Sequence, residues 1–177
     1  MTTSTNRCQA TRVTHTHTVM PEDTNPFHNL FGGQLMEFMN NSGYASFKRH
    51  TRQEGTTVSM DNLNFLEPIP MGHIIRIETF VSGVGKRSVE VFGKVIGTNI
   101  VEGGTYLAAT AFMTFAVTSE DTSLSYIASS QDSGVVKGIV PETAEEKFDC
   151  RDYAVRRTER LKILVDDQAF IKHLAEA

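Results

Sequence analysis

A change in the hydrophobic period near residue 56 limits the folds open to this chain. Before it, apolar and small residues recur at spacings of three and four, which predicts one helix of about four turns. After it, four segments alternate apolar with polar residues, and prolines or glycines separate them, which predicts antiparallel strands. One long helix wrapped by such a sheet is an α+β fold. The helical face comprises Leu35, Phe38, Met39, Ser42, Gly43, Ser46 and Phe47.

The two ends of the chain differ in composition from this central part. The stretch "ATRVTHTHTVM" alternates in period two and predicts a first strand. A later stretch rich in Ser, Asp and Gly is typical of a linker, and Pro141 opens a charged segment with acids first and bases last, as in a helix. The predicted division is a flexible tail (1–9), a folded domain (10–118), a linker (119–140) and a C-terminal helical extension (141–177).

Length and charge exclude several classes of protein. The 177 residues fit one domain with an appendage, and the net charge of −4 gives no reason to expect nucleic acid or an anionic membrane as partner. No run approaches about 18 apolar residues, so we expect a cytoplasmic protein without a membrane segment. The two cysteines, Cys8 and Cys150, lack metal-type spacing and are predicted to be free thiols.

The segment "NPFHNLFGGQLMEFMNNSG" carries the first candidate chemistry. Gly32 and Gly33 precede the helix, where unpaired N–H groups and positive potential favour a carbonyl or an anion; a plain turn is the alternative. Asn40 and Asn41 place two amides within a run of Leu, Met and Phe. The histidines form no HExxH or three-ligand pattern, and no GxSxG element is present, so we expect neither a metal nor a serine hydrolase.

Three blocks in the same order resemble the hotdog-fold acyl-CoA thioesterases of the bacterial and brain acyl-CoA hydrolase type. They are "MPEDTNPFHNLFGGQLMEFMNNSG", "VSMDNLNFLEPIPMG" and "VGKRSVEVFGKVIG". The resemblance implies a hotdog fold, in which a long helix is cradled in a curved antiparallel sheet. It also implies homodimers that share active sites, hexamers as trimers of dimers, acyl-CoA as substrate and no cofactor.

The resemblance assigns roles in catalysis. It places Asn29 in the catalytic pair and gives the thioester carbonyl to the backbone N–H of Gly33, beside Gly32. Asn40 stands where the family has a catalytic Asp, and a carboxamide is not a useful general base near neutral pH. Three explanations are open: a disabled Asp→Asn form, a natural paralogue that uses another carboxylate, or an acyl-CoA binder with little turnover. An alignment shifted by one would give the role to Asn41.

Other polar residues are candidates for supporting roles. Lys86, Arg87 and Ser88 form a basic spot at a Gly-flanked turn, where the coenzyme A phosphates could be held. Arg156, with Arg157 and Arg160, is a second phosphate candidate, with a solvated helix face as the alternative. Asp61 and Glu37 are candidate replacements for the missing base, although each is expected more often to be a strand or surface residue.

The sequence therefore predicts an acyl-CoA thioester hydrolase. Water would cleave the thioester to a free acid and coenzyme A, with Asn29 and Gly33 polarising the carbonyl. The alternatives are an acyl-CoA binding or sensing protein that has lost its base, and a hotdog dehydratase. The dehydratase needs a catalytic histidine near the helix, where only His28 is available.

Overall fold

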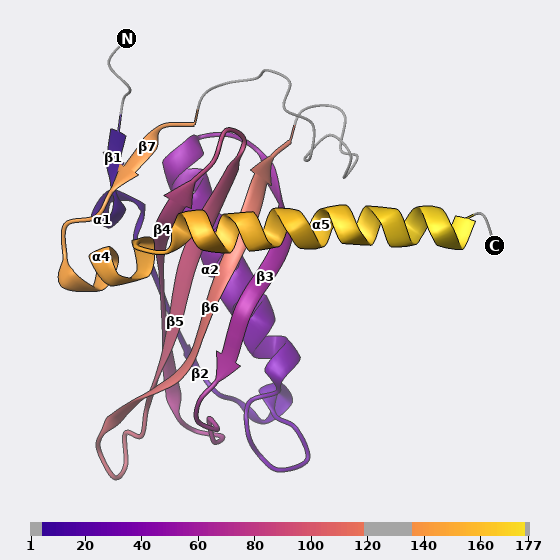
Figure 1. The fold of residues 1–177 in the computed structure, drawn as a ribbon. Coiled ribbons are helices and arrows are strands. Elements are labelled where there is room, and N and C mark those ends of the chain that lie inside the picture. The colour runs from indigo at the N-terminus through magenta and orange to yellow at the C-terminus, as the bar shows by residue number, and fades with distance from the viewer. Residues whose placement is uncertain (1–4, 119–135, 176–177) are drawn as a thin grey trace.

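A five-stranded antiparallel sheet curls around one long helix in the computed structural model, which describes residues 5–118 and 136–175 (Figure 1). The helix, α2 (Gly32–Thr51), lies against the concave face of the sheet. This is the predicted α+β hotdog arrangement. The strands in spatial order are β2 (Val13–Thr18), β4 (Ile74–Val84), β5 (Ser88–Thr98), β6 (Thr105–Val117) and β3 (Gly55–Phe65).

The predicted helical face of α2 packs on the sheet. Small residues let the two approach closely: the Ser46 hydroxyl lies 2.8 Å from that of Thr79 on β4, and a Cβ on Gly43 would lie 2.9 Å from the Met113 methyl. Burial of this apolar face is the main source of stability for such an element. The core around it contains Leu35, Met39, Phe47, Ile75, Ile77, Val89, Val91, Met113 and Phe115.

The N-terminal segment differs from the prediction of a flexible tail over 1–9. Residues 5–9 are ordered: β1 (Thr5–Arg7) pairs in parallel with β7 (Gly138–Val140), and α1 (Cys8–Thr11) follows. The imidazole of His50 holds this pair to the end of α2, because its Nδ1 lies 3.2 Å from Asn6 Nδ2 and its Nε2 lies 2.8 Å from the Lys137 carbonyl oxygen. The prediction was therefore wrong for these residues, and β7 falls inside the predicted linker.

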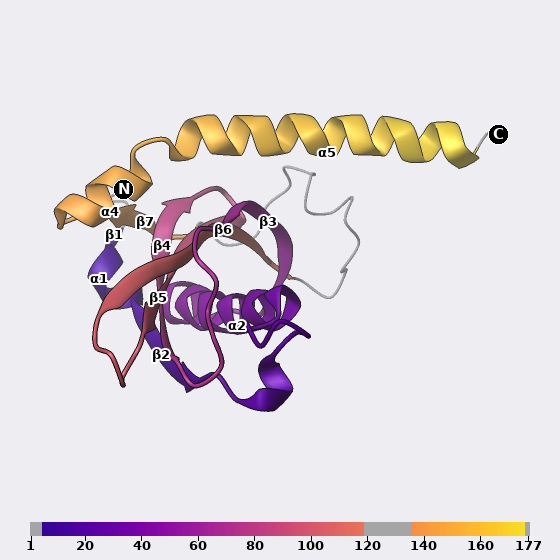
Figure 2. The same cartoon turned by 90° about the horizontal axis from the view of Figure 1, so that it is seen from below.

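The C-terminal extension is helical, as predicted. It consists of α4 (Ala144–Cys150) and α5 (Tyr153–Ala175). Figure 2 shows α5 on the convex side of the sheet, opposite α2, with its far end projecting beyond the sheet. Two arginines of α5 fix it to the sheet, because Arg156 and Arg160 both bind the buried carboxylate of Glu90 on β5.

Candidate active site

The start of α2 presents backbone donors. Phe31 caps the helix with extended backbone, and no side chain among the described residues bonds to this end. The first bond along the helix runs from the Leu35 N–H to the Phe31 carbonyl, at 3.0 Å. The N–H groups of Gly32 and Gly33 therefore remain available, at the end of the helix where the macrodipole is positive.

A tight loop delivers the chain to this helix start. The side-chain oxygen of Asn25 accepts from the N–H groups of Phe27 (2.9 Å) and Asn29 (3.3 Å). His28 adopts a left-handed conformation with φ of 59°, and Leu30 N–H bonds to the Ile69 carbonyl at 2.8 Å. Asn25 is thus a turn-forming residue that keeps its NH₂ group outside these bonds, and the Asn29 side chain makes no hydrogen bond to any described residue.

Aromatic rings stand beside the glycine pair. A Cβ on Gly33 would lie 2.6 Å from the Phe31 ring, and one on Gly32 would lie 3.4 Å from the Phe65 ring. Both rings are more than half exposed, as is Phe27. Exposed rings around open backbone donors suit a ligand with an apolar part and a carbonyl.

Asn40 lies two helical turns further along α2 and is held by a neighbour on the sheet. The hydroxyl of Thr57, on β3, donates to the Asn40 side-chain oxygen at 2.8 Å. Asn41 is exposed and makes no side-chain bond to a described residue, so the structure favours Asn40 as the placed amide. Glu37, one turn before Asn40, is exposed and accepts from Gln34 at 3.1 Å.

Asp61 lies away from this cluster. Its carboxylate accepts from Arg160 Nη1 at 2.8 Å, on the convex side where α5 packs, and from the Ser59 hydroxyl at 3.1 Å. Asn40, by contrast, lies on the helix of the concave side. Within one subunit, Asp61 is therefore part of the attachment of α5 and does not meet the helix start.

Arg156 is occupied by internal partners. Its Nη2 donates to Glu90 at 2.8 Å and to the Asp149 carbonyl at 2.7 Å, while its guanidinium carbon lies 3.8 Å from the centre of the Phe112 ring. Only 12 % of its side chain is exposed. The predicted alternatives of phosphate contact and solvated helix face both fail to describe this position, because Arg156 neutralises a buried acid.

The basic hairpin of Lys86, Arg87 and Ser88 lies at the other end of the molecule from the glycine pair. Ser88 pairs with Ala116, and the Arg87 carbonyl accepts from Val117, which pairs with Gly55. This is the end of the sheet beside Phe47, near the C-terminus of α2. From Gly33 to Phe47 the helix rises about 21 Å.

Two other features are absent from the described part of the chain. No three His, Cys, Asp or Glu side chains between residues 5 and 118 or 136 and 175 gather as metal ligands would. Within the same residues, no helix combines the length and the apolar character needed to cross a bilayer.

Comparison with known proteins places the chain in a family. A model of the thioesterase superfamily matches residues 27–103. The uncharacterized acyl-CoA thioester hydrolase YkhA of Bacillus subtilis is 37% identical over 161 residues, which cover 91% of this chain and 88% of YkhA. This chain belongs to the acyl-CoA thioester hydrolases. Family membership agrees with the hotdog fold and with the three sequence blocks that suggested it.

Solved structures of other family members extend the likeness to nearly the whole chain. The acyl-CoA hydrolase of Bacillus cereus is 32% identical with a TM-score of 0.82, covering 97% of this chain and 98% of its own. That of Staphylococcus aureus, in complex with butyryl coenzyme A and coenzyme A, is 27% identical with a TM-score of 0.82, covering 97% and 99%. An apo-hexameric acyl-CoA thioesterase is 25% identical with a TM-score of 0.78, covering 92% and 97%.

Three variants of the Staphylococcus aureus enzyme have been solved, each with alanine in place of a different residue. The replaced residues are an asparagine, an aspartate 15 positions later, and a threonine 17 positions after the aspartate. Sequence reasoning on the present chain did not single out a threonine. Thr57, whose hydroxyl bonds to Asn40, meets it only because β3 packs beside α2, and no local sequence pattern indicates this contact.

Proposed function

We propose that this protein acts on acyl-CoA thioesters, binding the thioester carbonyl at the start of α2. The observation that carries the proposal is the uncapped Gly32-Gly33 helix start, with exposed aromatic rings around it, in a chain of this family. Backbone N–H groups at this position would donate to the carbonyl oxygen as negative charge develops on it. The products would be a free carboxylic acid and coenzyme A.

The intervals between polar residues favour Asn25 over Asn29 as the asparagine of the site. Asn25 precedes Asn40 by 15 positions, and Thr57 follows Asn40 by 17, which are the intervals between the substituted residues of the Staphylococcus aureus enzyme. Asn29 would precede Asn40 by only 11. Asn25 also keeps its NH₂ group available while its oxygen holds the loop.

The site requires two subunits in this proposal. Gly33 and Asn40 lie on the same face of α2, seven residues and about 10 Å apart, whereas a reacting carbonyl and its attacking water need groups within about 3 Å. A second copy running in the opposite direction would bring its Asn40 beside Gly33. The edge strand β3, which carries Thr57, is the natural place for such pairing, and related proteins include a hexameric thioesterase.

Asn40 determines how fast the reaction can be. A carboxamide can position a water molecule, but it cannot accept a proton near neutral pH or attack the thioester as a carboxylate does. This chain would therefore bind acyl-CoA well and hydrolyse it slowly, as an Asp→Asn form would. The same observation supports the second candidate, a non-hydrolytic acyl-CoA binder or sensor.

Two measurements on the unaltered protein distinguish these functions. Calorimetry with butyryl-CoA and a longer acyl-CoA measures binding, and a thiol-reactive dye measures release of coenzyme A. Binding with slow release supports a hydrolase, and binding with release no faster than in buffer supports a sensor. Absence of binding to every acyl-CoA would contradict both functions.

A further inference from the structure

The two cysteines, which are 142 positions apart, lie side by side. The Sγ atoms of Cys8 and Cys150 are 3.8 Å apart, and both residues are free thiols. Cys8 begins α1 and is fully buried against Phe80 and Phe92, while Cys150 ends α4 and is partly exposed. A disulfide has an S–S distance of about 2.05 Å, so closing the gap requires the sulfurs to move together by less than 2 Å.

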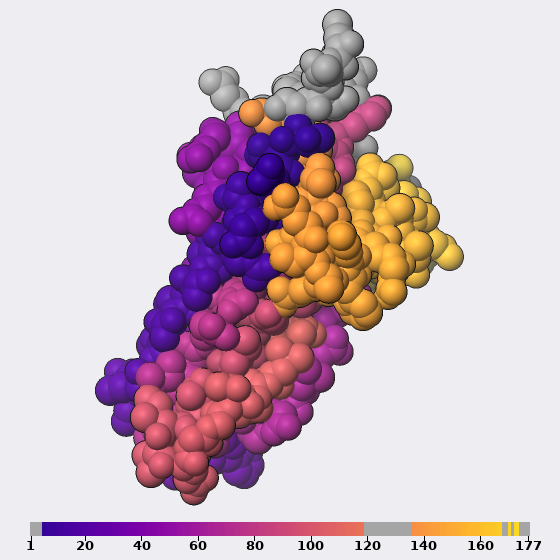
Figure 3. All heavy atoms as spheres, turned by 90° about the vertical axis from the view of Figure 1, so that its left-hand side faces the viewer, coloured from indigo at the N-terminus to yellow at the C-terminus, as the bar shows by residue number. Residues whose placement is uncertain are grey.

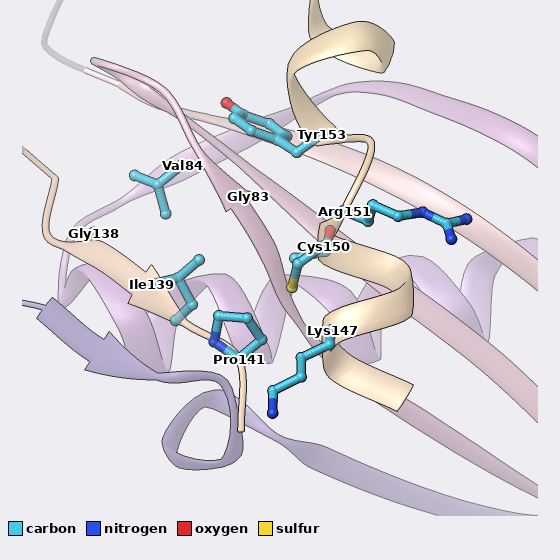
Figure 4. Close-up of a pocket in the computed structure, with 10 residues that line it drawn as sticks. Gly83, Val84, Gly138, Ile139, Pro141, Lys147, Cys150, Arg151 and Tyr153 are labelled. Carbon is cyan, nitrogen blue, oxygen red and sulfur yellow. The ribbon is translucent and has the colours of Figure 1, made fainter. Parts of the chain in front are cut away.

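Cys150 opens into a cavity of about 400 Å³. Figure 4 shows its sulfur pointing towards Pro141 on the side where Ile139 also lies, with Lys147 beside Pro141 and the Arg151 side chain extending the other way. The cavity lies among β4, β7 and the turn between α4 and α5. Figure 1 shows these elements away from the start of α2. A small molecule can therefore approach Cys150, whereas Cys8 is shielded behind it.

The surroundings divide the roles of the two thiols. The hydrogen bond between the two sulfurs lowers the pKa of Cys150, with a further contribution from Arg156, and these outweigh burial and the nearby Asp149 and Glu146. The same hydrogen bond, together with burial, raises the pKa of Cys8. The accessible thiol is the one that ionises first, as in pairs with one attacking and one resolving cysteine.

We propose that Cys8 and Cys150 form a redox-active dithiol that reacts with a low-molecular-weight disulfide entering the cavity. The Cys150 thiolate attacks one sulfur of the small disulfide RSSR, forming a mixed disulfide and releasing RS⁻. Cys8, after losing its proton to solvent or to RS⁻, attacks Cys150 Sγ and releases the second RS⁻. The protein loses two electrons and two protons, and RSSR is reduced to two RSH.

The disulfide would fasten the N-terminal segment to the C-terminal extension. Figure 3 shows these two parts of the chain in contact on one face. The bond would close a loop of more than 100 residues, so the melting temperature of the oxidised protein should exceed that of the reduced protein by roughly 5–15 °C. This inference does not depend on the proposed hydrolysis.

The test uses the full chain and oxidised glutathione, followed by acid quenching and intact mass measurement. The wild-type protein should lose two hydrogens, retain no glutathione, migrate as a monomer on a non-reducing denaturing gel, and recover its original mass with dithiothreitol. Stable glutathionylation without closure, disulfide-linked dimers as the main product, or no reaction would each overturn the proposal. The wild-type result decides it even if a variant fails to fold.

Variants assign the two roles, since the chain has no other cysteine. Cys8→Ser and Cys8→Ala should retain one glutathionyl group on Cys150. Cys150→Ser should react at Cys8 at least about tenfold more slowly, because that thiol is buried. The double variant Cys8→Ser/Cys150→Ser should show no melting shift on oxidation. Equally fast modification of Cys8 in Cys150→Ser would contradict the assigned order of attack.

Discussion

The hydroxyl of Thr57 donates a 2.8 Å hydrogen bond to the side-chain oxygen of Asn40, across the contact between β3 and α2. An aspartate at position 40 would have the same shape and could accept the same bond with one oxygen, leaving the other free. The protein is therefore built to hold a planar side chain with an acceptor at this point. What it lacks is the negative charge that would make that side chain a base or nucleophile.

Asn40→Asp should raise the rate of acyl-CoA hydrolysis by about 10²- to 10⁴-fold, the usual contribution of a positioned general base. The size of the side chain is unchanged, so the gain should appear in kcat and not in KM. The measurement is thiol release with butyryl-CoA. Asn41→Asp is the matched control, because it adds the same charge one position later on an exposed surface. A larger gain from Asn41→Asp would shift the assignment by one residue.

Thr57→Val should lower kcat about tenfold in an Asn40→Asp background, whereas Thr57→Ser should keep most of the activity. The hydrogen bond favours the charged carboxylate, so its loss should also move the acidic limb of the pH profile to higher pH. Thr57 is exposed, and the melting temperature should change little. Equal activity of the Val and Ser variants would show that the hydroxyl does not support the carboxylate.

Asn25→Asp and Asn29→Asp separate the two candidate asparagines, again in an Asn40→Asp background. At position 25 an aspartate can still accept from the N–H groups of Phe27 and Asn29, so the loop should persist, but the NH₂ donor is lost. Asn25→Asp should lower kcat by about 10²-fold if that donor contacts the thioester. Asn29→Asp should lower kcat by less than about 10-fold. The reverse order would return the role to Asn29.

Long periodic segments made the main fold predictable from sequence. The helix from residue 32 and the strands after residue 55 each bury a regular set of apolar residues, so local pattern and tertiary packing agree. β1 and β7 have three residues each and no detectable period. They exist because residues more than 130 positions apart pair with each other, and His50 then fastens the pair to α2.

The candidate site was predictable at the helix start and less so elsewhere. A glycine pair before an apolar helix has a local physical meaning, and the structure leaves its N–H groups uncapped. The choice between Asn25 and Asn29 depends on which side chain forms hydrogen bonds within the loop, and no local sequence pattern reveals this. The sequence around Arg156 suggests a surface residue, because its partner, Glu90, lies on a strand 66 positions earlier. The Cys8–Cys150 contact was missed for the same reason.

Arg156→Ala should destabilise the fold by about 3 kcal/mol, because it leaves the buried Glu90 with Arg160 as its only ion-pair partner among the described residues, beside the Ser82 hydroxyl, and removes the stack on Phe112. Arg151→Ala is the matched control: its ion pair with Asp152 is more than half exposed and should matter by less than about 0.5 kcal/mol. Urea unfolding followed by circular dichroism measures both. An Arg156→Ala protein of normal stability that bound acyl-CoA weakly would instead restore the predicted phosphate contact.

Asp149→Asn should stabilise the protein at pH 7. Burial is the main cause that raises the pKa of Asp149 to about 6 from an ordinary value of 3.8, and Glu145 adds to it. Above pH 6 the folded protein must ionise this carboxyl in a place that disfavours the charge, while the unfolded chain ionises it freely. The carboxyl therefore costs stability at neutral pH, and that cost is relieved as the pH falls through 6 towards 4.

The expected gain from Asp149→Asn is about 1–3 kcal/mol at pH 7, shrinking towards zero by about pH 4, since each pKa unit corresponds to about 1.4 kcal/mol. Urea unfolding of wild type and variant at a series of pH values measures the difference. Asp152→Asn is the control, because its carboxylate is 54% exposed beside Arg151 and its removal should change stability by less than about 0.5 kcal/mol. A loss of stability in Asp149→Asn at pH 7 that fades as the pH falls would mean that the Asp149 carboxylate is favourably bound in the folded protein.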